Sequence, residues 1–385
     1  MQLRAAIAAA AALAACDKRR DAAPAAAPAA APSPSPAAAP PGGPALRPIA
    51  ELRERAVLVE GTRRIALWVG EAGWYEPDGR GLAAQPLMGA AIARARAELG
   101  ELTEVFLGTR PVLAGGEEHR ERVLQLAPAP RELALRGMPV QVATAGALDV
   151  WRYEHELRSE LATIDAAGAV TALPALPRLG PDVEAMSVVG AKACATPRVR
   201  DLAGARDAVL ALVTECHPRA PVRIATYRWP PAGAGSAPAR EVATLGTLAE
   251  LDLQIDRLLA TRDGAPILVG RRGDTVVVMR VGAGGGATSW GRLAGVEAVT
   301  HAAVADDGAV WIRTIGRGEQ GHDRVVIARD GAPQELASPA GASLRAESLA
   351  LDDRLGIVVL ASEGAARWLL AERPPAGPPV VLPAR

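Results

Sequence analysis

The chain is poor in several residue types that most folded domains use. Only 3% of its 385 residues are aromatic, and Phe106 is the only phenylalanine. A core must therefore be built from Ala, Val, Leu and Ile. Formal net charge is zero at pH 7, and this argues against nucleic acid as a partner, which needs a basic surface. Lys18 and Lys192 are the only lysines and asparagine is absent, a bias that is typical of a GC-rich bacterial genome and carries no information on function.

Long apolar runs are also lacking, because nothing beyond residue 48 is long enough to span a membrane. One short apolar run lies at the start, where Arg4 precedes Ala5 to Ala12 and the run ends in Leu13-Ala14-Ala15-Cys16. A positive charge, a short apolar segment and small residues form the layout of a secretion signal. The Leu-Ala-Ala-Cys ending resembles the lipobox of bacterial lipoproteins.

That resemblance implies that residues 1–15 are a removed lipoprotein signal peptide and that Cys16 becomes the acylated first residue of the mature chain. Several acyl chains, palmitate among them, would make membrane anchoring stable. We therefore expect an exported protein whose partner is the lipid bilayer, at the periplasmic side of the inner or outer membrane or at the cell surface. The alternative is an alanine-rich N-terminus that happens to contain a cysteine.

Residues 16–48 have the composition of a disordered linker. After a charged collar they contain almost only Ala, Pro, Ser and Gly. Such a segment cannot bury enough apolar surface to offset the entropy of ordering it, and its prolines favour extended conformations. It is interpreted as a tether between a membrane and a folded domain of residues 49–385.

Short β-rich runs separated by Gly and Asp turns fill the folded domain and are clearest in three C-terminal units. Turn glycines and aspartates suit tight hairpins, because they supply positive φ or local side-chain hydrogen bonds. The expected strands are 257–261, 266–270, 275–281 and 288–293 in the first unit, 302–305, 309–313, 324–328 and 333–337 in the second, and 349–351, 357–361, 367–371 and 379–382 in the third.

The spacing of these units predicts an all-β fold of the β-propeller type. Gly308 follows Gly264 by 44 residues, and Gly356 follows Gly308 by 48. Four strands in about 45 residues are typical of a propeller blade, so residues 49–385 accommodate about seven four-stranded blades. The segment from Ala303 to Trp311 resembles the blade motif of bacterial sensory and lyase-type propellers. Tandem β-sandwiches are the alternative fold.

Two segments interrupt the strand pattern. Residues 89–102 contain strong helix formers and predict a surface helix between early blades. Residues 230–238 form a Pro/Gly/Ala loop that is too long for a hairpin. Either segment is a tolerated insertion or a contributor to a binding face, since propeller loops commonly carry function.

Cys194 and Cys216 are the only cysteines after Cys16. An exported protein with two cysteines favours a disulfide. Antiparallel strands at 188–196 and 208–216, joined by a loop near Ala205, would place them opposite each other. Free thiols and a metal site with His217 are the alternatives, although a metal would lack a clear fourth ligand.

No catalytic, metal or cofactor motif stands out. The segment after His155 lacks the second histidine of a zinc-protease helix, and the glycine-rich run 282–289 lacks the lysine of a phosphate-binding loop. His301 lies in an apolar strand and is interpreted as a packing residue rather than a base. The sequence therefore predicts no catalytic residue, metal or cofactor, and leaves enzymatic activity open with a non-enzymatic role favoured.

The leading hypothesis is a membrane-anchored lipoprotein whose propeller is a binding or scaffold module for an envelope protein, peptide or glycan. Trp74, Trp229 and Trp290 lie near turns and are candidates for its binding face, unless they pack between blades. The alternative is a propeller hydrolase or lyase that acts on carbohydrate or peptidoglycan, with residues from different blades meeting over the central channel.

Overall fold

The folded unit lies within Pro44–Arg385 of the computed structural model. The structure describes residues 46–71, 73–100, 103–116, 122–126, 130–135, 137–155, 158–179, 197–216, 219–229, 238–282, 286–316, 323–329, 334–336, 345–363 and 366–382. The signal peptide, the tether up to residue 45, Cys16 and Cys194 fall outside these residues.

The described residues form seven antiparallel sheets, which are the blades numbered here in chain order. Blade 1 contains β2 (Ala56–Gly61), β3 (Arg64–Val69), β4 (Gly73–Asp78) and β5 (Gly81–Ala84). Blade 2 contains β6 (Glu104–Leu107), β7 (Pro111–Gly115), β8 (Arg122–Gln125) and β9 (Arg131–Glu132). Blade 3 contains β10 (Met138–Ala145), β11 (Leu148–His155), β12 (Arg158–Ile164) and β13 (Val170–Ala172). Blade 4 contains β14 (Arg198–Gly204), β15 (Ala208–Thr214), β16 (Pro221–Arg228) and β17 (Ala239–Thr247).

The last three blades follow a short helix, α4 (Leu248–Leu251), and have strands where the sequence predicts them, apart from the outer strand of the last blade. Blade 5 contains β18 (Gln254–Ala260), β19 (Pro266–Arg272), β20 (Thr275–Val281) and β21 (Ala287–Leu293). Blade 6 contains β22 (Val296–Val304), β23 (Val310–Gly316), β24 (Arg324–Ala328) and β25 (Gln334–Glu335). Blade 7 contains β26 (Arg345–Asp352), β27 (Gly356–Glu363), β28 (Ala366–Ala371), β1 (Arg47–Leu52) and β29 (Val380–Leu382).

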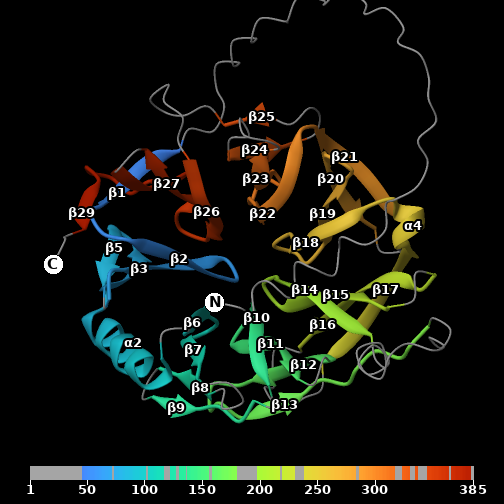
Figure 1. Ribbon diagram of the computed structural model, residues 1–385, viewed down its shortest axis with the longest axis horizontal. Coiled ribbons are helices and arrows are strands. Elements are labelled where there is room, and N and C mark those ends of the chain that lie inside the picture. Colours follow the sequence, from blue (N-terminus) through green and yellow to red (C-terminus); the bar gives the residue numbers. More distant parts are fainter. Residues whose placement is uncertain are drawn as a thin grey trace, which may run out of the picture. The chain divides into compact units, whose positions relative to one another are not determined.

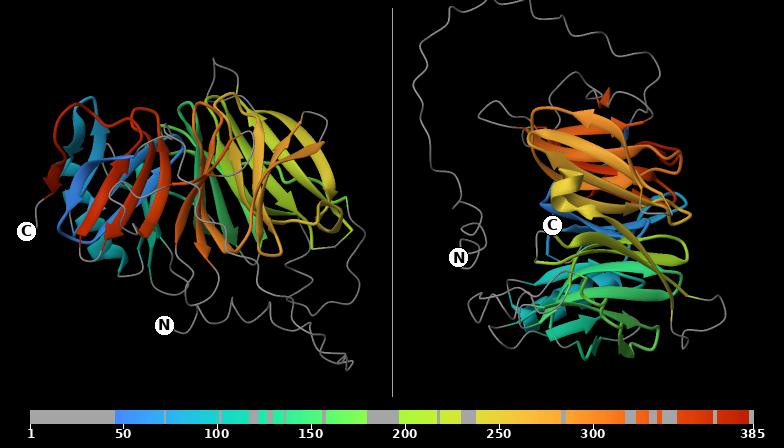
Figure 2. Two further views of the ribbon diagram at one scale, coloured as in Figure 1. Left: turned by 90° about the horizontal axis from the view of Figure 1, so that it is seen from above. Right: turned by 90° about the vertical axis from the view of Figure 1, so that its right-hand side faces the viewer.

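The blades lie in a ring, with the first strand of each sheet on the inside (Figure 1). The inner strands contact their neighbours in the order β2, β6, β10, β14, β18, β22 and β26, and β26 contacts β2 again. Seen from the side, the strands of successive blades stand beside one another around the ring (Figure 2). The fold is therefore the expected seven-bladed β-propeller, and the tandem β-sandwich alternative is wrong.

The ring is closed by a strand from the beginning of the folded unit. β1 pairs antiparallel with β28, so that Pro48 lies opposite Leu370 and Leu52 opposite Arg367. The final strand β29 pairs parallel with β1 rather than with β28. The expectation that residues 379–382 supply the fourth strand of the last blade is therefore corrected, since β1 takes that position. Strand β1 also starts before the expected domain boundary at residue 49.

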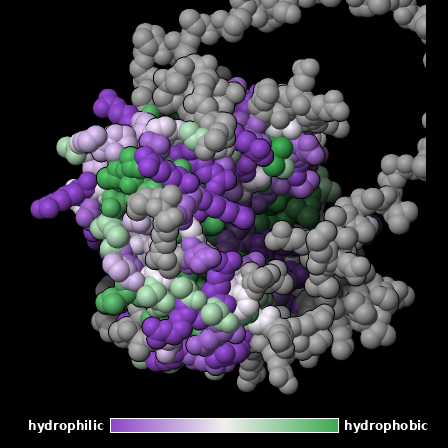
Figure 3. Space-filling view, turned by 60° about the vertical axis from the view of Figure 1, so that its left-hand side comes forward, coloured by the Kyte–Doolittle hydropathy of each residue, from purple (hydrophilic) through white to green (hydrophobic). Residues whose placement is uncertain are grey.

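The core lies between the blades. Apolar side chains of adjacent sheets form its clusters, in which Trp151 and Trp311 on second strands are fully buried. Alanine, valine, leucine and isoleucine make up most of the rest, as the scarcity of aromatic residues requires. Hydrophilic residues cover much of the face shown in Figure 3, with apolar patches between them.

The expected helix lies between blades 1 and 2 but starts earlier. Helix α2 spans Pro86–Leu99 rather than residues 89–102. Pro86 begins the helix, where its fixed φ fits and its missing N–H costs nothing. Ile92, Ala95 and Leu99 are buried against the core of these two blades. The helix therefore covers the ring's outside with one face and is not wholly a surface element.

The hairpin expected to carry the cysteine pair is shifted in register. Strand β14 begins at Arg198, which lies opposite Thr214 on β15, whereas the disulfide model requires residue 196 at that place. The expected strand 188–196 therefore does not supply the partner of β15. Cys216 follows β15 and is exposed, and a bond to Cys194 stays a prediction.

Candidate functional site

The inner strands of all seven blades surround a cavity of about 550 Å³. Its lining extends from Val57 and Val140, near the start of their strands, to Thr62 and Arg63 in the hairpin turn between β2 and β3. Volumes of this size accommodate small ligands or a side chain of a larger partner. This cavity is called the channel below.

Four consecutive blades place a polar residue into the channel from equivalent positions of their inner strands. In each case the residue comes directly after a β-bulge, an irregularity that re-aims a side chain. Because each inner strand is otherwise mainly apolar, these residues make one polar band on the channel wall. The four residues are Gln141, Asp201, Arg257 and His301.

Asp201 joins three blades through its carboxylate. One oxygen accepts hydrogen bonds from the Gln141 amide at 2.6 Å and from the Leu202 N–H at 3.0 Å. The other accepts from the Leu258 N–H at 2.7 Å. Burial raises the pKa of Asp201, while the charge of Arg257 and these hydrogen bonds lower it. Since both oxygens are occupied, Asp201 positions its neighbours rather than offering a free acceptor.

Arg257 is the positive charge of the polar band. Its guanidinium donates a hydrogen bond to the Thr300 carbonyl of blade 6 at 2.6 Å. Burial raises the pKa of Asp201 and of Glu60, the latter on the inner strand of blade 1, and the charge of Arg257 offsets part of both rises. The same charge also lowers the pKa of His301. Arg257 therefore sets the electrostatic potential that the other channel groups experience.

His301 is a neutral imidazole in the channel wall. Burial, Arg257 and Arg313 lower its pKa to about 4, so it carries no charge at neutral pH. Its Nδ1 atom is buried and has no hydrogen-bond partner within the described part of the chain. A buried polar atom without a partner is costly. The interpretation of His301 as a hydrogen-bonded packing residue is corrected, because this nitrogen is unsatisfied and the residue lines the channel.

Glu60 faces the polar band from blade 1. Its side chain is exposed inside the ring, and its carboxylate lies within range of the charges of Arg257 and Asp201. The surrounding blades raise the pKa of Glu60 by partial desolvation, and the charge of Arg257 offsets part of this rise. No hydrogen bond or ion pair joins Glu60 to another residue in the described ranges.

The turn between β2 and β3 closes one end of the channel by reaching across to distant blades. The Thr62 hydroxyl accepts a hydrogen bond from the Thr144 N–H of blade 3 at 2.8 Å. A Cβ atom on Gly204 of blade 4 would lie 2.2 Å from the same hydroxyl oxygen. Only glycine at this position lets the turn approach so closely. Figure 1 shows the β2 hairpin extending toward the centre of the ring.

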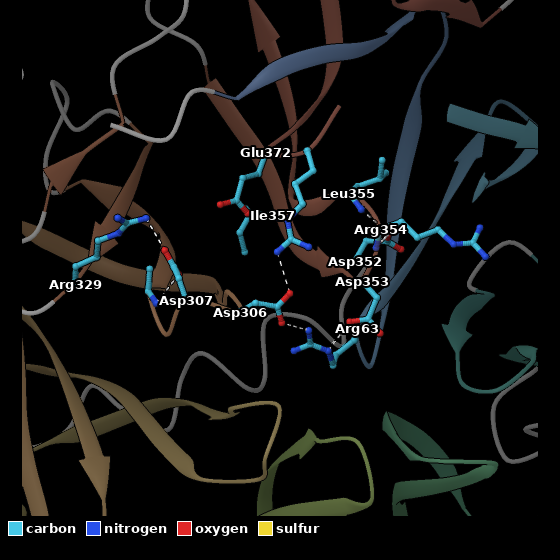
Figure 4. A network of polar contacts seen from close by, with 12 residues as sticks. Arg63, Asp306, Asp307, Arg329, Asp352, Asp353, Arg354, Leu355, Ile357 and Glu372 are labelled. Atoms are coloured by element: carbon cyan, nitrogen blue, oxygen red, sulfur yellow. Dashed lines mark hydrogen bonds and ion pairs between the residues drawn. The ribbon is translucent and has the colours of Figure 1, made fainter. Parts of the chain in front are cut away.

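Arg63 fastens that turn to blades 6 and 7 (Figure 4). Its Nε donates to Asp353 at 2.6 Å, and its Nη2 pairs with Asp306. Arg373 also donates to Asp306 at 2.9 Å, and the bonds from Arg373 and Arg63 lower the pKa of Asp306. Arg63 has a left-handed φ of 54°, a strained conformation for a side chain of this kind. The network therefore holds a strained turn as a plug.

The opposite end of the channel presents apolar side chains to solvent. Val57 is 46% exposed and Val140 is 38% exposed, and both line the channel. Exposed valines at a rim are suited to contact with an incoming ligand. The described residues thus form a pocket with a plug at one end and an apolar rim at the other.

One of the tryptophans proposed for a binding face lies in the core instead. Trp74 is 1% exposed, packs in the core of blade 1 and donates from its indole nitrogen to Glu76 at 2.9 Å. It is therefore removed from the candidates. Trp229 is half-buried and stacks on Tyr227 with ring centroids 6.4 Å apart. The side chain of Trp290 and the loop 230–237 lie outside the described residues.

Sequence reasoning missed Glu60, Asp201 and Arg257. Asp201 and Arg257 share a sequence signal, because each is a charged residue three places before the end of its inner strand.

No group of three His, Cys, Asp or Glu side chains able to hold a metal ion occurs among the residues that the structure describes. Within the same residues, no helix has the length and apolar character to cross a bilayer.

Comparison with known proteins finds distant structural neighbours. No family model and no curated protein matches the chain. Among solved structures, a catalytically inactive virginiamycin B lyase from Staphylococcus aureus with quinupristin is 12% identical, with a TM-score of 0.45, covering 85% of this chain and 95% of that one. The β-propeller domain of Cps50 (Swd1) from Myceliophteria thermophila is 11% identical, with a TM-score of 0.44, covering 83% and 99%. A 6-phosphogluconolactonase-like protein from Bacteroides uniformis is 14% identical, with a TM-score of 0.39, covering 81% and 93%.

Proposed function

We propose that this chain is a lipid-anchored protein of the bacterial cell envelope whose propeller binds a ligand in the channel without transforming it. The observation that carries the binding role is a cavity between the inner strands whose wall presents a carboxylate without a partner among the described residues. Glu60 is exposed within this cavity, and no hydrogen bond or ion pair joins it to another described residue. A bound ligand would supply a hydrogen-bond donor to this carboxylate, whereas the Nδ1 atom of His301 is buried in the wall and is not a ligand contact.

The shape of the channel supports the same role. A cavity of about 550 Å³ lies within the range of about 300–1,000 Å³ that small-ligand sites occupy. The plug at Arg63 makes the channel a pocket rather than a pore, and the exposed rim valines offer apolar contact to the ligand. A propeller on a tether would present such a pocket to the space around the membrane.

The binding role is tested by narrowing the rim. Val57→Trp places a large side chain at the rim, and Val242→Trp is the matched control, because Val242 is 42% exposed on the outer strand of blade 4. The full chain in detergent is screened by thermal shift against amino acids, peptides, peptidoglycan fragments and oligosaccharides. We expect a compound that raises Tm in the wild type and in Val242→Trp but not in Val57→Trp. Equal shifts in both variants would contradict the channel as the site.

The anchor is tested separately at Cys16. In a bacterium that exports the protein, the wild type should incorporate labelled palmitate and partition into detergent. Cys16→Ser should abolish both, whereas the tether variant Ala22→Ser should change neither. Unchanged labelling of Cys16→Ser would refute lipid anchoring.

One observation favours a second function, a hydrolase or lyase that acts on carbohydrate or peptidoglycan. Glu60 has a raised pKa and His301 is neutral in the same cavity, which are the states that general acid and general base catalysis require. Such an enzyme would release new products from peptidoglycan or oligosaccharides, and Glu60→Gln would stop their release. A binding protein returns its ligand unchanged.

A further inference from the structure

We propose that the channel binds an organic cation, a primary ammonium or a guanidinium on a short apolar stem, with Glu60 as its counter-ion. This inference rests on the proposed binding function, because it names the ligand class of the same pocket.

The lining contains more carboxylates than guanidinium groups, although the chain as a whole has no net charge. A local imbalance in an enclosed, low-dielectric space acts strongly on a ligand's charge. The lining carboxylates are Glu60, Glu104 and Asp201, and the lining guanidinium groups are Arg63 and Arg257.

Arg63 cannot offset the carboxylates of the channel. Its guanidinium is already paired with Asp306 and Asp353 at the plug. Arg63 and Arg373 together balance Asp306 and Asp353, so the plug adds no net positive charge to the pocket. Figure 4 shows the Arg63 side chain directed toward these two aspartates.

Arg257 and Asp201 form the second charge balance. Burial raises the pKa of Asp201, and the positive charge of Arg257 offsets part of this rise. Their charges offset one another within the polar band, which leaves Glu60 and Glu104. Neither glutamate has an ion-pair partner in the part of the chain that the structure describes. When both are ionised, the channel is therefore short of positive charge.

Glu60 is the group that gains most from a cation. Burial raises its pKa because the enclosing protein disfavours the charged form. A cation beside the carboxylate would favour the charged form again and create a charge-assisted hydrogen bond. Binding and ionisation of Glu60 are then coupled, so affinity should fall as the pH falls through the pKa of Glu60.

Apolar side chains provide a surface for the ligand's stem. Val59, Val105, Leu259 and Ala303 line the wall, and Val57 stands at the rim. Amphipathic cations place an alkyl stem along such a wall and their charged group at a polar end. The same chemistry occurs in small free amines and in lysine or arginine side chains of a peptide partner.

The test compares matched probes by calorimetry on the full chain in detergent. The small probes are n-butylammonium, n-butanol and butyrate, which share a stem and differ in charge, together with agmatine. We expect the two cations to bind at least about tenfold more tightly than the alcohol and the acid. A tripeptide Gly-Lys-Gly, compared with Gly-Ala-Gly, shows whether a side chain or a free amine is the better source of the cation.

The variants connect the charge preference to Glu60. Glu60→Gln should weaken n-butylammonium binding about tenfold and remove its pH dependence. Glu241→Gln, which removes an exposed carboxylate from the outer strand β17, should bind as the wild type does. Glu104→Gln provides a second channel variant with a smaller expected loss, and the Tm of each variant verifies folding.

The outcomes separate this inference from the proposed function. If butanol or butyrate binds as well as n-butylammonium, or if Glu60→Gln binds the cation as tightly as the wild type, the cation assignment is wrong. If a neutral or anionic ligand binds and is blocked by Val57→Trp, the binding function holds and only the ligand class fails. If no channel ligand of any charge is found, both are refuted.

Discussion

Protonation of Asp149 provides a test of how burial of an ionisable group affects the stability of this propeller. Asp149 is the second residue of β11, the second strand of blade 3, and is 1% exposed. Its carboxylate accepts hydrogen bonds from the Thr109 N–H at 2.6 Å and from the Thr109 hydroxyl at 3.0 Å, which joins blade 3 to a turn of blade 2. A Cβ on Gly108 would lie 2.4 Å from a carboxylate oxygen, so this contact also requires glycine.

The magnitude follows from the pKa. Burial raises the pKa of Asp149 from 3.8 to about 6, although the Thr109 hydrogen bonds lower it. The folded state therefore holds the proton more tightly than the unfolded state. Below the unfolded pKa this group contributes its full stabilisation, and the contribution is lost as the pH rises through about 6. A shift of this size corresponds to about 3 kcal/mol in the free energy of unfolding.

Asp149→Asn removes the titration and keeps the shape of the side chain, since the amide oxygen still accepts from the Thr109 N–H. Guanidinium unfolding of wild type and variant between about pH 4 and pH 7 gives the difference in unfolding free energy. As the pH rises from about 4 to about 7, we expect the free energy of unfolding of the variant to increase by about 2–3 kcal/mol relative to that of the wild type. Asp263→Asn is the control of opposite sign, because a hydrogen bond from Thr261 lowers the pKa of Asp263. A pH-independent difference between wild type and Asp149→Asn would refute the reasoning.

Three further predictions concern charge pairs and the cysteines. The buried side chains of Arg223 and Glu215 form an ion pair with an N–O distance of 2.9 Å and exposures of 2% and 4%. Arg223→Met should lower the free energy of unfolding by about 3–5 kcal/mol, and adding Glu215→Leu should recover part of this loss. A smaller loss in the single variant would contradict this. Arg63→Met should release the plug and cost about 1–2 kcal/mol, whereas unchanged urea unfolding would show that the turn holds without it. Mass spectrometry of the unreduced exported protein should find Cys194 linked to Cys216, a bond worth about 3 kcal/mol, and complete thiol labelling would exclude it.

Local turn chemistry explains why much of the fold is predictable from the sequence. Strands expected at 275–281 and 324–328 coincide with β20 and β24, because Gly and Asp turns bound them. The closing strand β1 was not predicted, since its partner β28 lies more than 300 residues away along the chain. No periodicity or turn signal near residues 47–52 records which strand they will join.

The candidate site was less predictable for a related reason. Tryptophans near turns indicated a binding face, but Trp74 is buried in the core beside blade 1. The residues that do line the channel come from separate strands and meet only when the ring closes. His301 and Arg257 each appear in the sequence as a polar residue at the start of a short apolar run. Their direction depends on β-bulges, and sequence patterns do not locate a bulge.

Contacts between blades explain what fixes those bulges. Arg152 of blade 3 donates to the Val199 and Arg200 carbonyls at 3.0 and 2.8 Å, at the bulge that precedes Asp201. Arg313 of blade 6 donates in the same way to the Ala346 carbonyl of blade 7 at 2.6 Å, beside the bulge of β26.

An arginine on the second strand of one blade thus binds the irregular backbone of the next blade's inner strand. A bulge leaves carbonyl groups outside the regular ladder, and a guanidinium is well suited to donate hydrogen bonds to several of them. At Asp201, the bonds that hold blades 3 and 4 together therefore also support the bulge that directs a polar residue into the channel. Because scaffold and pocket depend on the same contacts, loss of Arg152 should disturb Asp201 even though Arg152 does not line the channel.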